Sequence, residues 1–137
     1  MAYWLMKTEP GTWSWDDQVE AGTAEWDGVR NHQASNNMKA MKVGDRAFFY
    51  HSVNEKRIVG IVEVAKEYYP DPTDPSGRFG MVDVKAVKPM ETPVSLVDIK
   101  ADERLSDMPL IRQSRLSVMP VTEAQWKMIC DKGETKA

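Results

Sequence analysis

The 137-residue sequence contains one cysteine, Cys130, so the chain cannot form an internal disulfide. No apolar run approaches the roughly 20 residues that a helix needs to span a bilayer. The first ten residues also lack the charged start, apolar middle and small-residue cleavage site of a signal peptide. We therefore expect a cytoplasmic protein without a membrane segment.

The motifs of common nucleotide-binding and hydrolytic enzymes are missing as well. The eight glycines form no G-x-G pair, no G-K-[ST] follows any of them, and no G-x-S-x-G occurs. The only imidazoles, His32 and His51, match no zinc-ligand spacing together with Cys130. Cys130 shares an apolar stripe with Trp126 and Ile129, where we expect it to be buried. These absences predict no metal, no cofactor and no enzymatic activity.

Acidic residues slightly outnumber basic ones, 21 against 18, and the net charge is −3. This value argues against a protein that holds nucleic acid by bulk electrostatics, because such binding scales with the number of cationic contacts. The charges are unevenly distributed: residues 14–27 contain five acids and no base, whereas residues 28–58 contain six bases and two acids. Such a pattern is compatible with an anion-tolerant cleft, and equally with a solvated face.

Hydrophobic patterning predicts short strands and helices in mixed order. Strands are expected over residues 2–8, 46–52, 57–69, 78–89 and 115–121, and helices over 15–22, 31–42, 95–102 and 123–132. Consecutive strands with short joints favour an antiparallel or mixed sheet. We expect one α+β domain over residues 1–137, built on a curled, barrel-like sheet flanked by short helices. Its predicted core includes Met38, Val62, Val84, Leu116 and Ile129.

Amides are clustered in one stretch and tryptophans are abundant, and both suit a planar ligand. The stretch "RNHQASNNMKAM" (30–41) holds five amide or imidazole side chains within residues 30–37, where a solubilising helix would use Glu and Lys. Four of the five tryptophans fall in the first 26 residues. Some are expected in the core, and one or two are expected to stack on a base. Because amides pair with base edges and arginines with phosphates, this composition predicts a site for a nucleotide or nucleic acid.

Four blocks of the chain resemble those of the EVE-domain family, within the PUA-like superfamily. The first is "YWLMKTEP", which is similar to W-L-x-K-[ST]-E-P. The second is "WDGVRNHQASNNMKAMKVGDRAFFYHS", similar to W-x-G-V-R-N-[YH]-Q-A-x-N followed by G-D-x-x-x-F-Y-H-S. The others are "IVGIVEV", similar to G-I-x-E-V, and "LSDMPLIRQSRLSVMPV", similar to a R-Q-[SP]-R-L-S-V ending. The blocks occur in family order from about residue 3 to residue 126.

The resemblance implies a curled β-barrel flanked by helices, with an aromatic-walled pocket for a modified base. The expected ligands are 5-methylcytosine and its oxidised forms in DNA, bound by a monomer that needs no membrane. Matched position by position, the implied ligand-binding residues are Trp4, Lys7, Thr8, Glu9, Pro10, Trp26, Arg30, Asn31, Gln33, Asn37, Tyr50, His51, Ser52, Arg112, Gln113, Ser114 and Arg115. Of these, Arg30 and Arg115 are expected to line a cleft and to be dispensable for folding.

Two positions depart from the family pattern. Ser35 stands where the family often has arginine, and Phe79 stands where it often has tryptophan. Both changes are expected to alter ligand preference.

Two alternatives stay open from the sequence alone. In the first, the same pocket belongs to a small-molecule enzyme, in which Glu9 acts as acid or base and Lys7 or His51 assists. The competing interpretation is structural: Glu9 forms an ion pair with an arginine or caps a turn. In the second, the acidic segment 14–27 docks a protein partner.

Overall fold

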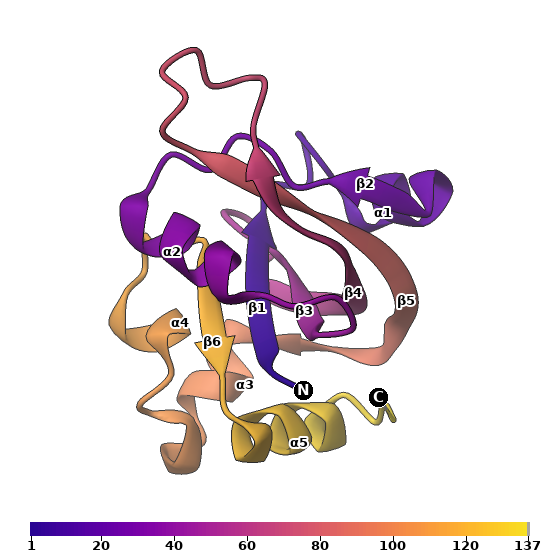
Figure 1. The fold of residues 1–137 in the computed structure, drawn as a ribbon. Helices are drawn as coiled ribbons and strands as arrows, with labels where there is room; N and C mark the ends of the chain where they lie inside the picture. Colours follow the sequence, from indigo (N-terminus) through magenta and orange to yellow (C-terminus); the bar gives the residue numbers. More distant parts are fainter. Residues whose placement is uncertain (137) are drawn as a thin grey trace.

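Six strands form one mixed sheet in the computed structural model, which describes residues 1–136 (Figure 1). The strands are β1 (Tyr3–Thr8), β2 (Thr23–Glu25), β3 (Arg46–His51), β4 (Arg57–Pro70), β5 (Gly80–Ser95) and β6 (Val118–Val121). Their order in the sheet is β2-β5-β4-β3-β1-β6. Strand β1 runs parallel to β3, and every other neighbouring pair is antiparallel. The expected mixed sheet is therefore confirmed.

The sheet is curved but open. Within residues 1–136, the two edge strands β2 and β6 do not pair with each other. Both are short, with three and four residues, and cannot supply the continuous ladder that closes a barrel. The expected barrel is thus only loosely supported by this architecture.

Helices lie around the sheet. They are α1 (Trp15–Ala21), α2 (His32–Ala40), α3 (Leu96–Lys100), α4 (Pro109–Arg112) and α5 (Glu123–Lys132), with one 3₁₀ turn, η1 (Glu103–Leu105). Capping boxes at Ser14 and Thr122 start α1 and α5. The side chain of Asn31 accepts the backbone N–H of Ala34 at 2.9 Å and caps α2.

Several predicted boundaries are wrong. Strand β5 continues through Pro89 to Ser95, because the pairing with β4 shifts register near Pro89 and no regular ladder bond is needed there. Strand β6 begins at Val118 rather than at residue 115. The hydrophobic pattern also failed to predict β2, η1 and α4, all of which are too short to show a period.

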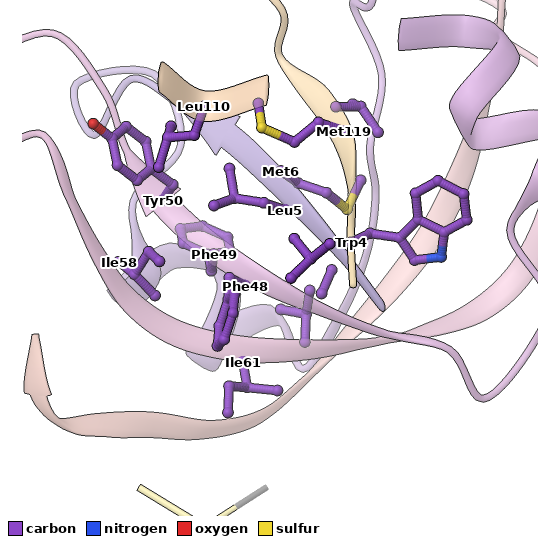
Figure 2. Packing of buried hydrophobic residues seen from close by; sticks show 14 of the residues in the cluster. Trp4, Leu5, Met6, Phe48, Phe49, Tyr50, Ile58, Ile61, Leu110 and Met119 are labelled. Carbon is purple, nitrogen blue, oxygen red and sulfur yellow. The ribbon is translucent and has the colours of Figure 1, made fainter. Parts of the chain in front are cut away.

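The hydrophobic core lies against β1 and β3 at the centre of the sheet (Figure 2). Leu5 and Met6 from β1 and Phe48 and Phe49 from β3 are fully buried. The ring of Phe48 stacks on Trp126 of α5 with 3.9 Å between ring centroids. The five predicted core residues are all buried, namely Met38, Val62, Val84, Leu116 and Ile129.

Cys130 is buried as predicted, and burial raises the pKa of its thiol to about 11. In the part of the chain that the structure describes, no helix is long and apolar enough to cross a membrane.

Candidate nucleic-acid interface

A cavity of about 610 Å³ opens at the carboxyl end of β1. This volume falls within the roughly 300–1,000 Å³ of typical small-ligand sites. We call it the larger cavity, to distinguish it from a smaller cavity described below. It is lined by Lys7, Thr8, Thr12, Trp13, Ala24, Glu25, Trp26, Asp27, Gly28, Val29, Arg30 and Ser117. These residues come from the end of β1, the turn before α1, β2 with the segment after it, and the start of the path into β6.

Two tryptophans contribute to the wall of the larger cavity. Trp26 is buried and rests edge-on against Phe49, with 5.6 Å between ring centroids and 88° between ring planes. Trp13 is half-buried, and its Nε1 donates to the Gln18 side chain at 3.0 Å. Its backbone carbonyl accepts from the Thr8 hydroxyl at 2.9 Å. Trp13 is therefore held in place at the wall of the larger cavity without being fully buried.

Lys7 is the cation of the larger cavity that lacks an acidic partner. Its Nζ donates to the carbonyl of Ser114 at 3.0 Å and lies 5.9 Å from the Tyr50 ring centroid. Burial lowers the pKa of Lys7, and it forms no salt bridge with any residue between 1 and 136. Such a group is suited to donate to a ligand that enters the cavity.

Asp27 supplies the opposite polarity. It lines the larger cavity and is exposed, and its carboxylate forms neither a hydrogen bond nor a salt bridge within the described residues. The larger cavity therefore offers both a hydrogen-bond donor, at Lys7, and an acceptor, at Asp27.

A smaller cavity of about 320 Å³ adjoins the larger one. Its lining residues are Asn31, Gln33, Arg112, Gln113, Ser114, Arg115 and Leu116. The Lys7–Ser114 hydrogen bond joins the walls of the two cavities. Arg112 is engaged by the Ser106 carbonyl at 3.0 Å, whereas the exposed Arg115 side chain has no hydrogen bond or ion pair in the region described. The smaller cavity therefore presents a free guanidinium group.

The structure brings ten of the seventeen predicted site residues to these two cavities. Lys7, Thr8, Trp26 and Arg30 line the larger cavity, and Asn31, Gln33, Arg112, Gln113, Ser114 and Arg115 line the smaller one. The other seven line neither, namely Trp4, Glu9, Pro10, Asn37, Tyr50, His51 and Ser52.

Those seven residues make contacts within the fold. Trp4 is buried and donates from Nε1 to Asp45 at 3.1 Å, and Asn37 donates to the carbonyl of Val118 at 2.8 Å. Tyr50 is buried in the core, and burial raises its pKa to about 12. His51 accepts the backbone N–H of Trp15 at 3.0 Å.

The remaining members of this group sit in the turns beside the larger cavity. The backbone N–H of Ser52 donates to the carbonyl of Thr8 at 2.8 Å. The carbonyl of Glu9 closes the turn to Thr12 and Trp13, while its side chain is exposed. This exposure does not favour Glu9 as an acid or base. Pro10 follows in the same turn.

The two departures from the family pattern have different surroundings. Ser35 is buried, and its hydroxyl lies 2.8 Å from that of Tyr68, so it faces the interior. Phe79 lies beside the larger cavity's Arg30, with the guanidinium 5.9 Å from its ring centroid, and 5.0 Å from the His32 ring.

Trp13 and Asp27 are among the lining residues that sequence reasoning missed. The density of early tryptophans was a usable signal for Trp13, but an isolated aspartate in a turn carries none. Within residues 1–136, no three His, Cys, Asp or Glu side chains cluster as a metal site requires.

Comparison with known proteins agrees with this fold. A family model described as the EVE domain matches residues 2–132. Mouse thymocyte nuclear protein 1 is 36% identical over 173 residues, covering 98% of this chain and 74% of the mouse protein. An NMR structure from Rhodopseudomonas palustris is 57% identical with a TM-score of 0.92, covering 98% of this chain and 94% of that chain.

A further solved structure is that of human THYN1 in complex with DNA that contains 5-methylcytosine. It matches with a TM-score of 0.91 at 34% identity and covers 100% of both chains. Because the family model matches residues 2–132 and a relative is 36% identical over 98% of this chain, the chain belongs to the EVE-domain family.

Proposed function

We propose that this chain binds nucleic acid by accepting a modified base, of the 5-methylcytosine type, into the larger cavity without catalysing a reaction. The observation that carries the proposal is the pair of adjoining cavities, one lined by the half-buried Trp13 and the other by the free Arg115 guanidinium. The human THYN1 complex with 5-methylcytosine-containing DNA supports it by kinship. We further expect the chain to act as a cytoplasmic monomer, through a PUA-like pocket formed by one domain over residues 1–137.

The larger cavity suits a cytosine ring. Trp13 can stack on its face, a contact worth roughly 1–3 kcal/mol per base. The exocyclic amine of cytosine is a donor that a carboxylate such as Asp27 accepts, and its ring carbonyl is an acceptor for the Lys7 ammonium. Uracil and thymine carry a carbonyl in place of that amine, so Asp27 would disfavour them.

The smaller cavity suits a phosphate next to the extruded base. A base that leaves the stack keeps its backbone outside the pocket, so phosphates lie near the cavity entrance. Arg115 is exposed and unengaged within the described residues, and Arg112 lies on the same wall. A guanidinium group can bind phosphate oxygens with two parallel hydrogen bonds.

Titration of the protein with single-stranded oligonucleotides tests the proposal. The oligonucleotides carry cytosine, 5-methylcytosine or thymine at one central position, at one fixed salt concentration of about 0.1 M. Tryptophan fluorescence should be quenched, and affinity should be highest for 5-methylcytosine and lowest for thymine. Asp27→Asn should reduce the cytosine-over-thymine preference, whereas Asp16→Asn, on the exposed face of α1 and away from both cavities, should leave it unchanged.

Two results would overturn the proposal. One is the absence of binding to every oligonucleotide. The other is a change in oligonucleotide mass after incubation, which would indicate catalysis instead of binding.

A further inference from the structure

One wall of the larger cavity has no regular secondary structure. The wall segment, residues 26–31, follows β2 and leads into α2, and it contributes Trp26 through Arg30 to the lining. Its Gly28 has φ of +79°, in the left-handed region that favours glycine. Apart from Trp26, whose N–H donates to the Val82 carbonyl at 2.8 Å, no ladder holds this segment. Its conformation must therefore depend on side-chain contacts.

Asp71 provides those contacts from the loop between β4 and β5, which extends beyond the sheet in Figure 1. Oδ2 of Asp71 accepts the backbone N–H of Gly28 at 2.9 Å and the Arg30 guanidinium at 3.0 Å. Its Oδ1 accepts the N–H and the hydroxyl of Thr73 at 2.8 and 2.6 Å. The second Arg30 nitrogen donates to the Thr73 hydroxyl at 2.9 Å. One carboxylate thus connects the loop to the wall segment at two points.

Asp71 and Arg30 depend on each other electrostatically. The Asp71 side chain has 0% of its surface exposed, against 37% for Arg30. Burial raises the pKa of Asp71, but hydrogen bonds from Thr73, Gly28 and Arg30 outweigh it and hold the pKa well below its usual range. The carboxylate is therefore charged, and a buried charge that loses its partner is strongly destabilising. If Arg30 left Asp71 to bind a phosphate, the buried Asp71 carboxylate would lose its cationic partner and the fold would be destabilised.

We infer that Asp71 is a positioning residue for the larger cavity, and that Arg30 serves as its partner in holding the wall segment instead of binding phosphate. This assignment differs from the sequence-based expectation that Arg30 is dispensable for folding. The role of Asp71 in holding the wall segment is argued from the hydrogen bonds alone. The effect of Asp71 and Arg30 on ligand affinity rests on the proposed function.

Hydrogen exchange tests the role of Asp71 in holding the wall segment. In the full chain, Asp71→Ala removes both oxygens, and we expect the Gly28 amide to exchange at least about tenfold faster. Asp74→Ala is the matched control, because Asp74 is a buried carboxylate of the same loop that accepts hydrogen bonds from Ser76, Arg78 and Phe79 but from no described residue of the wall segment. It should leave Gly28 exchange unchanged. If Asp71→Ala does not fold, Thr73→Val removes the hydroxyl shared by Asp71 and Arg30 and should give a smaller increase.

Unchanged Gly28 exchange in a folded Asp71→Ala protein, or in Thr73→Val if that is the folded variant, would overturn the inference. So would an equal increase in the Asp74→Ala control.

Salt dependence separates the two roles of arginine. Replacing a cationic side chain that contacts a phosphate lowers the slope of log Kd against log salt concentration by about one. We expect Arg30→Met to weaken oligonucleotide binding about tenfold through loss of preorganisation, with the slope unchanged. A slope reduced by about one would return Arg30 to the phosphate site. If the wild-type protein binds no oligonucleotide, the proposed function fails, while the exchange experiment still decides the role of Asp71.

Discussion

The imidazole Nε2 of His51 accepts a hydrogen bond from the backbone N–H of Trp15 at 3.0 Å. Its Nδ1 lies 3.0 Å from the Glu55 carboxylate, so the ring proton belongs on Nδ1 and Nε2 is free to accept. This bond joins the end of β3 to the first residue of α1. His51 therefore satisfies a buried backbone donor that the helix itself leaves unpaired.

Replacement of His51 should affect stability and not binding. His51→Phe leaves the Trp15 N–H buried without an acceptor, and we expect the free energy of unfolding to fall by about 1–3 kcal/mol. Oligonucleotide affinity should not change, because His51 lines neither cavity. Urea denaturation and titration of the same samples measure the two effects. Normal stability combined with lost binding would restore His51 to the ligand site.

The close approach of Trp15 to Gly60 predicts a second stability effect. A Cβ atom at Gly60 would lie 2.5 Å from the Trp15 ring, which is itself buried. We expect Gly60→Ala to lower the free energy of unfolding by about 1–3 kcal/mol through overpacking. Gly11→Ala is the control, since a Cβ atom at Gly11 would meet no other atom within 4 Å. Equal thermal melts for the two variants would contradict this prediction.

Acid should destabilise the protein through Asp74. Hydrogen bonds, first from the Ser76 side chain and then from the backbone of Phe79 and Ser76, lower the pKa of Asp74 from 3.8 to about 2. A carboxyl group whose pKa is lower in the folded state contributes stability above its unfolded pKa, and this contribution disappears as the pH falls through the folded pKa. Stability should therefore decline from about pH 4 toward about pH 2, and Asp74→Asn should flatten this decline in thermal melts. A decline as steep as in the wild type would show that Asp74 is not responsible.

Arg115 should affect binding and not stability. Its side chain is exposed and has no ion pair within residues 1–136. We expect Arg115→Ala to weaken oligonucleotide binding by about 1–3 kcal/mol and to lower the salt slope by about one. Arg115→Lys should not restore the affinity, because an ammonium group lacks the planar pair of donors. The unfolding free energy should stay within about 0.5 kcal/mol.

Lys127 on α5 provides the matched cation for this experiment, because it pairs with Glu123 at the surface and lines neither cavity. Lys127→Ala should leave affinity and salt slope unchanged. Unfolding of Arg115→Ala would instead show that the segment before β6 is a structural network.

Long elements that bury many apolar residues could be predicted from the sequence. The apolar run of β4 and the apolar stripe of α5 reflect burial, which the sequence records directly. Strand β2 has three residues and α4 has four, too few for a repeating hydrophobic pattern. These two elements form only because neighbouring structure holds them.

The candidate site was only partly predictable for a related reason. Trp4 and Trp26 look alike in the sequence, but the strand register puts the Trp4 indole against Asp45, away from both cavities, and the segment after β2 brings Trp26 to the larger one. Asp71 sits in a proline-rich loop, which is typical of an exposed position. Its partner Arg30 lies 41 residues away in sequence, so no local pattern could reveal the contact.

The position of β1 between β3 and β6 has a consequence for synthesis of the protein on the ribosome. Strand β1 emerges early, yet Leu5 pairs with Met119 of β6 and with Phe48 of β3. The edge of this largely apolar strand that pairs with β6 therefore stays unpaired while most of the described chain is translated. An unpaired apolar edge is prone to associate with other chains. We expect the nascent chain to depend on chaperone protection until β6 has left the exit tunnel.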